Sequence, residues 1–428
     1  MTLAPLRNIF RIPELRGRIL WTLGLLVVFR IGAHVSLPGV NPDAIHRFSD
    51  ETARSMGGLW NLLQMFSGGA LGHLALFSLG IAPYITASIA VQLLARVSPT
   101  LEAISKDGPR GQRKLKEITL YATVPVCLLQ ASMAVSQLSP FLVSPGFGTS
   151  ALLVTALTAG SFFLVWIGEQ ITERGLGNGA SILIMAGIVV RMPALLREMV
   201  RREPGADVVL LVLAFHLAAV VATVFITQAQ RRIPLQHASH VRGRRLQLGG
   251  RHYLPLRLLT AGVMPLIFAS SALVLPELVS FIPGLEGIRR PFREPGFALT
   301  LFYVGAILFL SYFWTYVFFS PSEIAHQLRE SGSFIPGIRP GERTAEYLNT
   351  ILSRLTLCGA GCLTAISLVP GFLARALGMD HLLEAFLGGS GLLIVVGVVL
   401  DLLQKVEASL LMHHYGGFLG RNGGTRGR

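Results

Sequence analysis

Charged residues are scarce in this chain of 428 residues. Asp, Glu, Lys and Arg together make up 14% of it, whereas soluble domains carry roughly 25%. Hydrophobic residues make up 52% of the chain, and its mean hydropathy is +0.58. So little charge could not cover a soluble protein of this length, and so much apolar sequence excludes a disordered chain. The composition favours a polytopic membrane protein, in which lipid covers most of the apolar surface.

Cysteine is also rare. The three cysteines, Cys127, Cys358 and Cys362, all fall inside apolar stretches. This number and placement exclude a disulfide scaffold. We expect the three side chains to be small buried hydrophobic groups.

Sequence motifs typical of enzymes are missing. The glycines of 175–179 are not followed by Gly-Lys-Ser/Thr, so they do not form a phosphate loop. Residues 388–391 match the Gly-x-Ser-Gly of rhomboid proteases, but only His413 and His414 follow, beyond the last apolar run. The eleven histidines are scattered and no HExxH is present. We therefore expect no enzymatic activity, no metal and no cofactor.

Ten apolar runs, each near 20 residues, dominate what is present. A run of that length crosses roughly 30 Å of hydrocarbon as a helix. The predicted spans are 18–38, 74–96, 117–138, 150–170, 178–196, 206–227, 257–280, 298–320, 351–374 and 385–404. Five spans in each half make the second half enter from the opposite side, as in inverted repeats, with a pathway between the halves. The predicted fold is an all-α membrane protein with halves 1–200 and 201–428.

The distribution of positive charge sets the predicted orientation. The net charge is +14, and with both termini inside, most of the Lys and Arg fall on the inside segments. Charge within the spans is sparse, at Arg30, Glu169 and Asp401. The alternative interpretation is a secondary solute transporter with inverted repeats. An ion-coupled transporter needs carboxylates near the midplane of the membrane, and the predicted spans have none there.

Two inside loops are long and a third is basic. Loop 228–256 holds six arginines and no acidic residue, loop 321–350 is mixed, and 105–116 is the third basic stretch. Such arginines are either a plain topology signal or a docking surface for phosphates and acidic protein grooves. Outside, apolar residues at 59, 62, 63 and 66 have helical spacing. That short helix, near 59–69, either lies on the membrane or folds back into the protein.

Five segments, in order along nearly the whole chain, resemble the SecY family, the channel subunits of the bacterial protein-export translocase. They are Ile12–Arg16 (IPELR), Leu79–Ile89 (LGIAPYITASI), Gly168–Gly179 (GEQITERGLGNG), Ala261–Pro265 with Phe268–Ser271, and Phe334–Gly341 (FIPGIRPG). In place of a phosphate loop, the resemblance makes 175–179 a tight cytoplasmic turn, with Glu169, Glu173 and Arg174 tying it to its neighbours.

The resemblance implies a ten-helix channel that passes unfolded secretory polypeptides between its halves. A lateral gate, made by spans two and three against seven and eight, would release apolar segments into lipid. The implied location is the bacterial plasma (inner) membrane. The implied partners are SecE, SecG, the motor ATPase SecA, the ribosome, nascent polypeptides and membrane lipids, with energy from SecA or the ribosome.

Site residues follow from the same resemblance, position by position. The apolar pore ring would be Ile81, Ile85, Ala180, Ile184, Ile267 and Ile394. The plug would be Leu59, Trp60, Leu62, Leu63 and Phe66. The lateral gate would include Gln130, Leu259 and Thr260. The docking arginines would be Arg244, Arg245 and Arg339. Two positions depart from the family: Ala180 is smaller than the usual aliphatic residue, and Leu259 stands where an Asn is usual.

Overall fold

The structure is a computed structural model of the whole chain. It describes residues 12–39, 64, 67–138, 142, 146–201, 205–237, 240–242, 245–247, 251–273, 275–276, 296–376 and 389–421. The chain divides into two compact units. The first comprises Met1–Glu203, Val274–Pro295 and Val398–Arg428, and the second comprises Pro204–Leu273 and Gly296–Gly397. The halves 1–200 and 201–428 stay a prediction.

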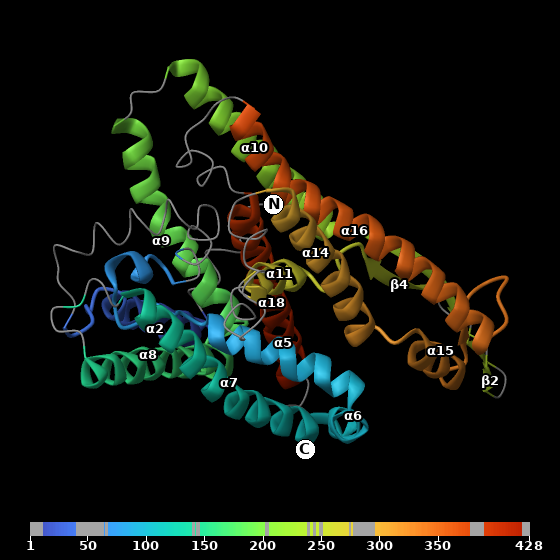
Figure 1. The fold of residues 1–428 in the computed structure, drawn as a ribbon. Helices are drawn as coiled ribbons and strands as arrows, with labels where there is room; N and C mark the ends of the chain where they lie inside the picture. Colours follow the sequence, from blue (N-terminus) through green and yellow to red (C-terminus); the bar gives the residue numbers. More distant parts are fainter. Residues whose placement is uncertain are drawn as a thin grey trace. The chain divides into compact units, whose positions relative to one another are not determined.

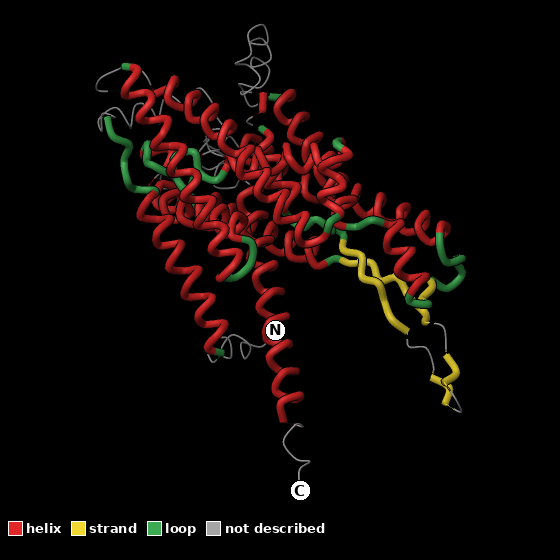
Figure 2. Tube along the Cα trace, turned by 90° about the horizontal axis from the view of Figure 1, so that it is seen from below, coloured by secondary structure: helices red, strands yellow, loops and turns green. Residues whose placement is uncertain are grey.

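Helices make up most of the described chain (Figures 1 and 2). Those of the first unit are α2 (Pro13–Gly32), η1 (Ala70–His73), α5 (Ala82–Val97), α6 (Pro99–Lys106), α7 (Gly108–Leu138), α8 (Phe147–Arg174) and α9 (Gly179–Arg201). Those of the second are α10 (Ala206–Gln228), α11 (Met264–Ala272), α14 (Phe297–Phe318), α15 (Pro321–Glu330) and α16 (Glu342–Ala376). The last helix, α18 (Gly389–Arg421), contributes residues to both units.

Each of the ten predicted spans overlaps one of these helices. Five described helical stretches are long and apolar enough to cross a membrane: Gly108–Ser136, Phe147–Arg174, Val209–Gln228, Phe297–Glu330 and Glu342–Leu373. Two shorter apolar helices are Ala82–Val97 and Gly179–Ala194. The stretch in α10 has the highest mean hydropathy, 2.8, yet only 17% of it is buried. Such an apolar and exposed helix is stable in lipid and not in water.

Two predicted spans begin later than the sequence suggested. The span predicted over 74–96 becomes helical only at Ala82, after turns in which Gly80 has φ +60°. The span predicted over 257–280 becomes helical only at Met264, after Gly262, also at φ +60°. A proline, Pro83 or Pro265, stands in the first turn of each helix, where its missing N–H costs nothing. Glycine and proline therefore fix both helix starts.

In the first unit, α7 packs between α5 and α8, and α8 also contacts α2 and α9. The C-terminal part of α7 meets α8 through buried apolar residues, Ala131 and Val135 against Leu153 and Leu157. Gly160 lets the backbone of Leu76 approach α8, because a Cβ there would lie 2.2 Å from the Leu76 carbonyl oxygen.

In the second unit, α14 packs against α11 and α16. The rings of Phe268 on α11 and Trp314 on α14 stack with centroids 5.0 Å apart. The hydroxyl of Tyr316 on α14 donates to Asn349 Oδ1 on α16 over 2.8 Å. Aromatic stacking and hydrogen bonds thus join these helices.

Loop 228–256 contains strands, which the apolar pattern did not predict. β1 (Gln230–His237) pairs antiparallel with β4 (Arg251–Arg257) and with β5 (Ser333–Phe334), in the order β4-β1-β5. A separate pair joins β2 (His240–Arg242) and β3 (Arg245–Gln247). The described strands gather in one region of the second unit (Figure 2, yellow).

The cysteine expectation was partly wrong. Cys127 is buried, but Cys358 is exposed and Cys362 is half-buried. Both lie on α16, whose exposed side chains include Leu357 and Phe372. A thiol on such an apolar surface suits lipid as well as a protein core does.

Candidate docking surface and channel elements

The turn that carries Arg339 has a defined geometry. The Ile338 N–H donates to the Ile335 carbonyl over 3.1 Å, and Gly337 between them has φ +82°. Pro336 and Gly337 occupy the two central positions, which is the sequence of a type II turn. The Thr344 hydroxyl then donates to the Arg339 carbonyl over 2.9 Å. The turn is thereby fixed to the first turn of α16.

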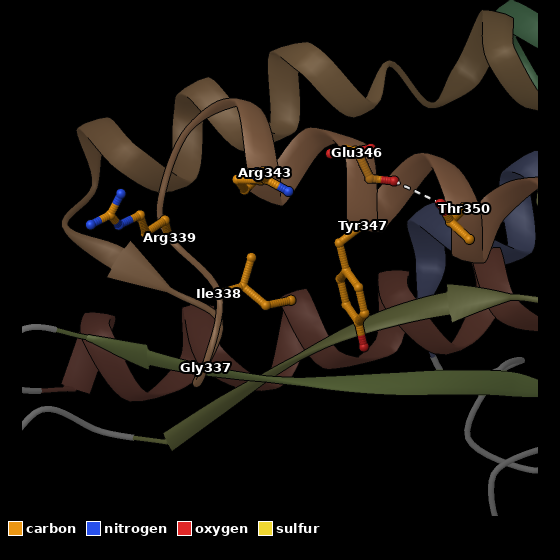
Figure 3. Close-up of a pocket in the computed structure, with 7 residues that line it drawn as sticks. All are labelled: Gly337, Ile338, Arg339, Arg343, Glu346, Tyr347 and Thr350. Carbon is orange, nitrogen blue, oxygen red and sulfur yellow. Dashed lines mark hydrogen bonds between the residues drawn. The ribbon is translucent and has the colours of Figure 1, made fainter.

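A pocket of about 560 Å³ opens beside this turn (Figure 3). Its lining residues are Gly337, Ile338, Arg339, Arg343, Glu346, Tyr347 and Thr350, which we call the docking pocket. Arg339 and Arg343 are exposed and form no ion pair within the described part of the chain. The side chain of Tyr347 points toward the strands, whereas the side chain of Arg339 points away from Tyr347 (Figure 3). The two exposed guanidinium groups, one directly after the turn and one in the first turn of α16, suit phosphates or carboxylates of a partner.

An apolar cluster lies beneath the docking pocket. Its buried members are Ile233, Leu235, Leu256, Ile335, Leu348 and Ile351, from β1, β4, the turn and α16. Ile324 and Leu328 of α15 pack against it. The strands thus place one face on this core, while the opposite face carries exposed Arg232, Tyr253 and Arg257. The β1 and β4 parts of the basic loop therefore form a folded platform.

The other two predicted docking arginines, Arg244 and Arg245, lie between β1 and β4 in the sequence. Arg244 lies outside the described residues. Arg245 begins β3 and pairs with Arg242 of β2. Their docking role stays a prediction.

The turn at 175–178 is tight, as the resemblance implied. Gly177 has φ +81°, and the Gly179 N–H donates to Thr172 Oγ1 over 2.9 Å. A Cβ on Gly179 would lie only 1.8 Å from the Gly168 carbonyl oxygen. The Leu176 N–H also donates to Thr22 Oγ1 of α2 over 3.2 Å. This turn therefore joins α2, α8 and α9.

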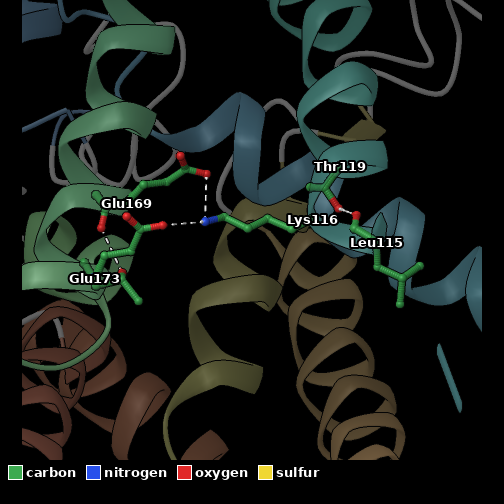
Figure 4. Close-up of polar contacts among 8 residues, drawn as sticks. Leu115, Lys116, Thr119, Glu169 and Glu173 are labelled. Atoms are coloured by element: carbon green, nitrogen blue, oxygen red, sulfur yellow. Dashed lines mark hydrogen bonds and ion pairs between the residues drawn. The ribbon is translucent and has the colours of Figure 1, made fainter. Parts of the chain in front are cut away.

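The charged residues beside this turn do tie it to its neighbours. Lys116 of α7 reaches toward α8, with Nζ 3.2 Å from Glu169 Oε1 and 3.8 Å from Glu173 Oε1 (Figure 4). The Glu169 contact is an ion pair without the alignment of a hydrogen bond. Arg174 lies over the ring of Trp21, 6.0 Å from its centroid. The structural role predicted for Glu169, Glu173 and Arg174 agrees with this geometry.

The predicted ring residues are divided between the units. Ile81 and Ile85 stand at the start of α5 and Ala180 and Ile184 at the start of α9, all in the first unit. Ile267 on α11 and Ile394 on α18 belong to the second unit. The five isoleucines are nearly inaccessible, at 3% exposure or less, whereas Ala180 is half-buried.

Ile267 and Ile394 lie close to one tight contact of the second unit. A Cβ on Gly397 would lie 2.2 Å from Val263 Cγ1. Ile394 is one helical turn before Gly397, and Ile267 is one turn after Val263. Closure of all six residues into one ring stays a prediction.

The predicted gate residues have different surroundings. Gln130 on α7 is buried, and its Nε2 has no hydrogen-bond partner in the described chain. Leu259 and Thr260 precede α11, so the expectation that they lie on a helix was wrong. Leu259 lies against Gly359 of α16, where a Cβ would be 3.0 Å from Leu259 Cδ2. The Thr260 hydroxyl donates to the Arg257 carbonyl over 3.1 Å, so it is already used within its own turn.

The predicted plug residues Leu59, Trp60, Leu62, Leu63 and Phe66 lie outside the described residues. Two features were not predicted from the sequence. Arg191, half-buried in α9, is a further charge within a predicted span. The β1–β4 hairpin was also missed, although Ile233 and Leu235 on one side and Leu254 and Leu256 on the other alternate with polar residues or proline. That alternation is the signal that could have found it.

The chain is similar to known proteins over nearly its whole length. The sequence model of the SecY family matches residues 75–403. The protein translocase subunit SecY of Thermotoga maritima is 38% identical over 431 residues, which cover 99% of each chain. That of Pseudomonas aeruginosa is 40% identical over 415 residues, covering 94% of this chain and 92% of the relative.

Solved structures agree in fold. A protein-conducting channel superposes with a TM-score of 0.64 at 16% identity, covering 95% of this chain and 97% of the other. Sec61 in the canine ribosome–channel complex superposes with a TM-score of 0.61 at 15% identity, with the same coverage.

Proposed function

The chain belongs to the SecY family, and from this premise we propose that it forms a channel that passes unfolded secretory polypeptides across a membrane. Apolar segments of these polypeptides leave sideways into lipid. The single observation that carries the proposal is the 38–40% identity to translocase subunits across nearly the full chain. Fold similarity to a protein-conducting channel supports it.

The sealing of the channel is assigned to the predicted ring and plug. Ile81, Ile85, Ile184, Ile267 and Ile394 are stiff, bulky side chains, and an apolar constriction holds back ions by dewetting while it yields to a passing chain. Ala180 leaves this ring one side chain short. The plug, over 59–69, compensates by closing the channel from the outside.

The membrane in question is the bacterial plasma membrane, with both chain termini in the cytoplasm. Bacterial relatives and the apolar helices support this assignment. The excess of Lys and Arg on the segments predicted to lie inside supports this orientation.

The partners that drive translocation bind to the docking pocket and to the face of the β1–β4 hairpin that carries Arg232, opposite the apolar cluster. Exposed Arg339, Arg343 and Arg232 suit the phosphates of ribosomal RNA and the acidic grooves of SecA. A ribosome-bound Sec61 channel among the structures of the same fold supports the ribosome as a partner. SecE and SecG complete the membrane complex. The chain itself catalyses no bond chemistry, and its relatives are named as translocase subunits.

A secondary solute transporter is not favoured. The full-length relatives are translocase subunits. The charged residues that the sequence places within spans, including Arg191, do not supply the midplane carboxylates that ion coupling needs.

Reconstituted vesicles test this function. The purified channel with SecE and SecG should import a secretory precursor into vesicles when SecA and ATP are added. Arg339→Glu should abolish import and weaken SecA binding, because it reverses an exposed charge that lines the docking pocket. Arg197→Glu makes the same charge change at an exposed position of α9, beyond the fifth predicted span and so on the side predicted to lie outside, and should leave import near the wild-type level. Normal import by Arg339→Glu would contradict the assignment of this surface.

A further inference from the structure

Helix α7 is held at its two ends by different forces. Near its C-terminal end, the outer end under the proposed orientation, Ala131 and Val135 pack against α8 in an apolar cluster. Near the cytoplasmic end, Lys116 pairs with Glu169 and Glu173 of α8 (Figure 4). An apolar contact persists while its residues stay in lipid or protein, whereas an ion pair whose side chains are partly exposed can be broken and solvated.

A proline stands between these two attachments. Pro125 lies inside α7, nine residues after Lys116. Proline has no N–H to donate to the carbonyl one turn earlier, and its ring clashes with that carbonyl. A helix therefore bends most easily at a proline. The carbonyl concerned is that of Tyr121, a residue whose side chain is 78% exposed. The cytoplasmic half of α7 can therefore pivot at Pro125 while the outer half stays in place.

The carboxylates stand on a fixed base. Gly179 packs directly on the Gly168 backbone, and the Thr172 hydroxyl, one residue before Glu173, accepts the Gly179 N–H. Glu169 and Glu173 are thus on the part of α8 that is joined to α9 and, through Leu176 and Thr22, to α2. A movement that separates Lys116 from them is a movement of α7.

The cytoplasmic half of α7 carries its neighbours with it. A Cβ on Gly111 would lie 1.8 Å from the Ile104 carbonyl oxygen, so the start of α7 lies directly on the backbone of α6. Helix α6 follows α5 after a single residue, Ser98, and α5 packs along α7. Under the proposed function, α5 and α7 are spans two and three, the contribution of this unit to the lateral gate.

We propose that Lys116 is a positioning residue for this gate, a latch that holds the cytoplasmic half of α7 against α8 in the resting channel. The inference rests on the proposed channel function. An entering apolar signal segment displaces α7, the two ion pairs break, and α7 pivots at Pro125 together with α5 and α6. The strength of the latch then helps to set how apolar a segment must be to open the gate.

The other described ion pairs have a different geometry. Those of Glu14–Arg18, Glu102–Lys106, His326–Glu330 and Asp401–Lys405 each join residues four apart on one helix. Lys106 is therefore a matched control, since its 2.7 Å pair with Glu102 lies within α6, only ten residues from Lys116. Neutralising Lys106 removes the same charge from the same basic stretch, 105–116, but breaks no contact between two helices.

The size of the effect follows from exposure. The side chains of Lys116, Glu169 and Glu173 are 40%, 24% and 59% exposed, so water screens the pairs considerably. Pairs of this kind shift a two-state equilibrium by roughly two- to fivefold. Lys116→Gln should therefore raise the resting open fraction and the import of a precursor with a weakened signal segment by about that factor.

The experiment compares variants of the full channel complex. Resting conductance is measured in planar bilayers, and import of one precursor with a normal signal and one with a weakened signal is measured in vesicles. Lys116→Gln should increase conductance and weak-signal import while normal-signal import stays at the wild-type level. Lys106→Gln and Lys116→Arg should both match the wild type, because the first leaves the latch intact and the second restores its charge.

A double variant tests the pivot. Pro125→Ala gives α7 an unbroken hydrogen-bond ladder, so in the Lys116→Gln background it should return weak-signal import toward the wild-type level. An undiminished effect would overturn the pivot at Pro125. Equal behaviour of Lys116→Gln and Lys106→Gln would overturn the latch. Failure of the wild-type complex to import the normal precursor would instead refute the proposed function.

Discussion

Gly179 should be among the least replaceable residues of the first unit. A Cβ there would lie 1.8 Å from the carbonyl oxygen of Gly168 and 2.6 Å from its carbonyl carbon. Real Cβ atoms essentially never come within 3.0 Å of such atoms. Both obstacles are backbone, so Gly179→Ala requires α8 and α9 to separate by about 1 Å. Overpacking of this kind costs about 1–3 kcal/mol.

A second glycine supplies the control. An added Cβ on Gly305 of α14 meets no atom within 4 Å, and alanine is the better helix former by about 0.5–1 kcal/mol. Gly305→Ala should therefore leave stability unchanged or raise it slightly. The stability of the two Gly→Ala variants should therefore differ by roughly 1–4 kcal/mol, with Gly179→Ala the less stable.

Thermal unfolding of the purified complex in detergent measures this difference. Membrane proteins often unfold irreversibly, so all variants are heated at one scan rate and their apparent midpoints are compared. At roughly 2–4 °C per kcal/mol, Gly179→Ala should unfold several degrees below Gly305→Ala. Because Gly179 precedes Ala180 and Ile184 on α9, we also expect a larger resting ion leak. Equal midpoints for the two variants would refute the close-packing argument.

Two further predictions concern the seal and the gate. Deleting residues 60–66 should produce a large resting conductance in planar bilayers, and Ala180→Ile should reduce it by completing the apolar ring; no leak after the deletion would show that the ring seals alone. Leu259→Asn should change the hydrophobicity threshold for membrane insertion, because the asparagine can form a hydrogen bond worth about 1 kcal/mol in the closed gate. A graded series of signal segments measures this threshold. An unchanged threshold would show that this position does not contribute to the gate.

Long apolar runs were the part of the fold that the sequence could predict. Hydrophobicity over 20 residues locates helices such as α8 and α14 well, because lipid imposes both their length and their composition. Helix starts were less predictable, since apolar Leu258 and Leu259 continue the run of α11 although Gly262 and Pro265 delay the helix to Met264. Hydropathy does not register a turn made of apolar residues.

The sequence could predict which residues belong to the docking surface better than it could predict what holds them in place. Family resemblance selected Arg339, but the apolar support beneath it comes from Ile233 and Leu256, distant in sequence, and depends on strand pairing. Lys116 was part of a basic stretch with no individual role. Its pairing with Glu169 and Glu173 depends on how α7 packs against α8, which no local pattern encodes.

The apolar cluster under the docking pocket has a mechanical consequence. A partner that pushes or pulls on an unstructured loop loses its work to bending of the loop. Here the β4-β1-β5 sheet, the turn at 335–338 and the start of α16 share one close-packed core, and close-packed interiors have low compressibility. Force applied at Arg339 or on the hairpin is therefore transmitted along the axis of α16 from Glu342 as far as Pro370, the proline near the other end of this helix. The platform is thus a stiff base, through which a bound partner can apply load directly to a helix long and apolar enough to cross a membrane.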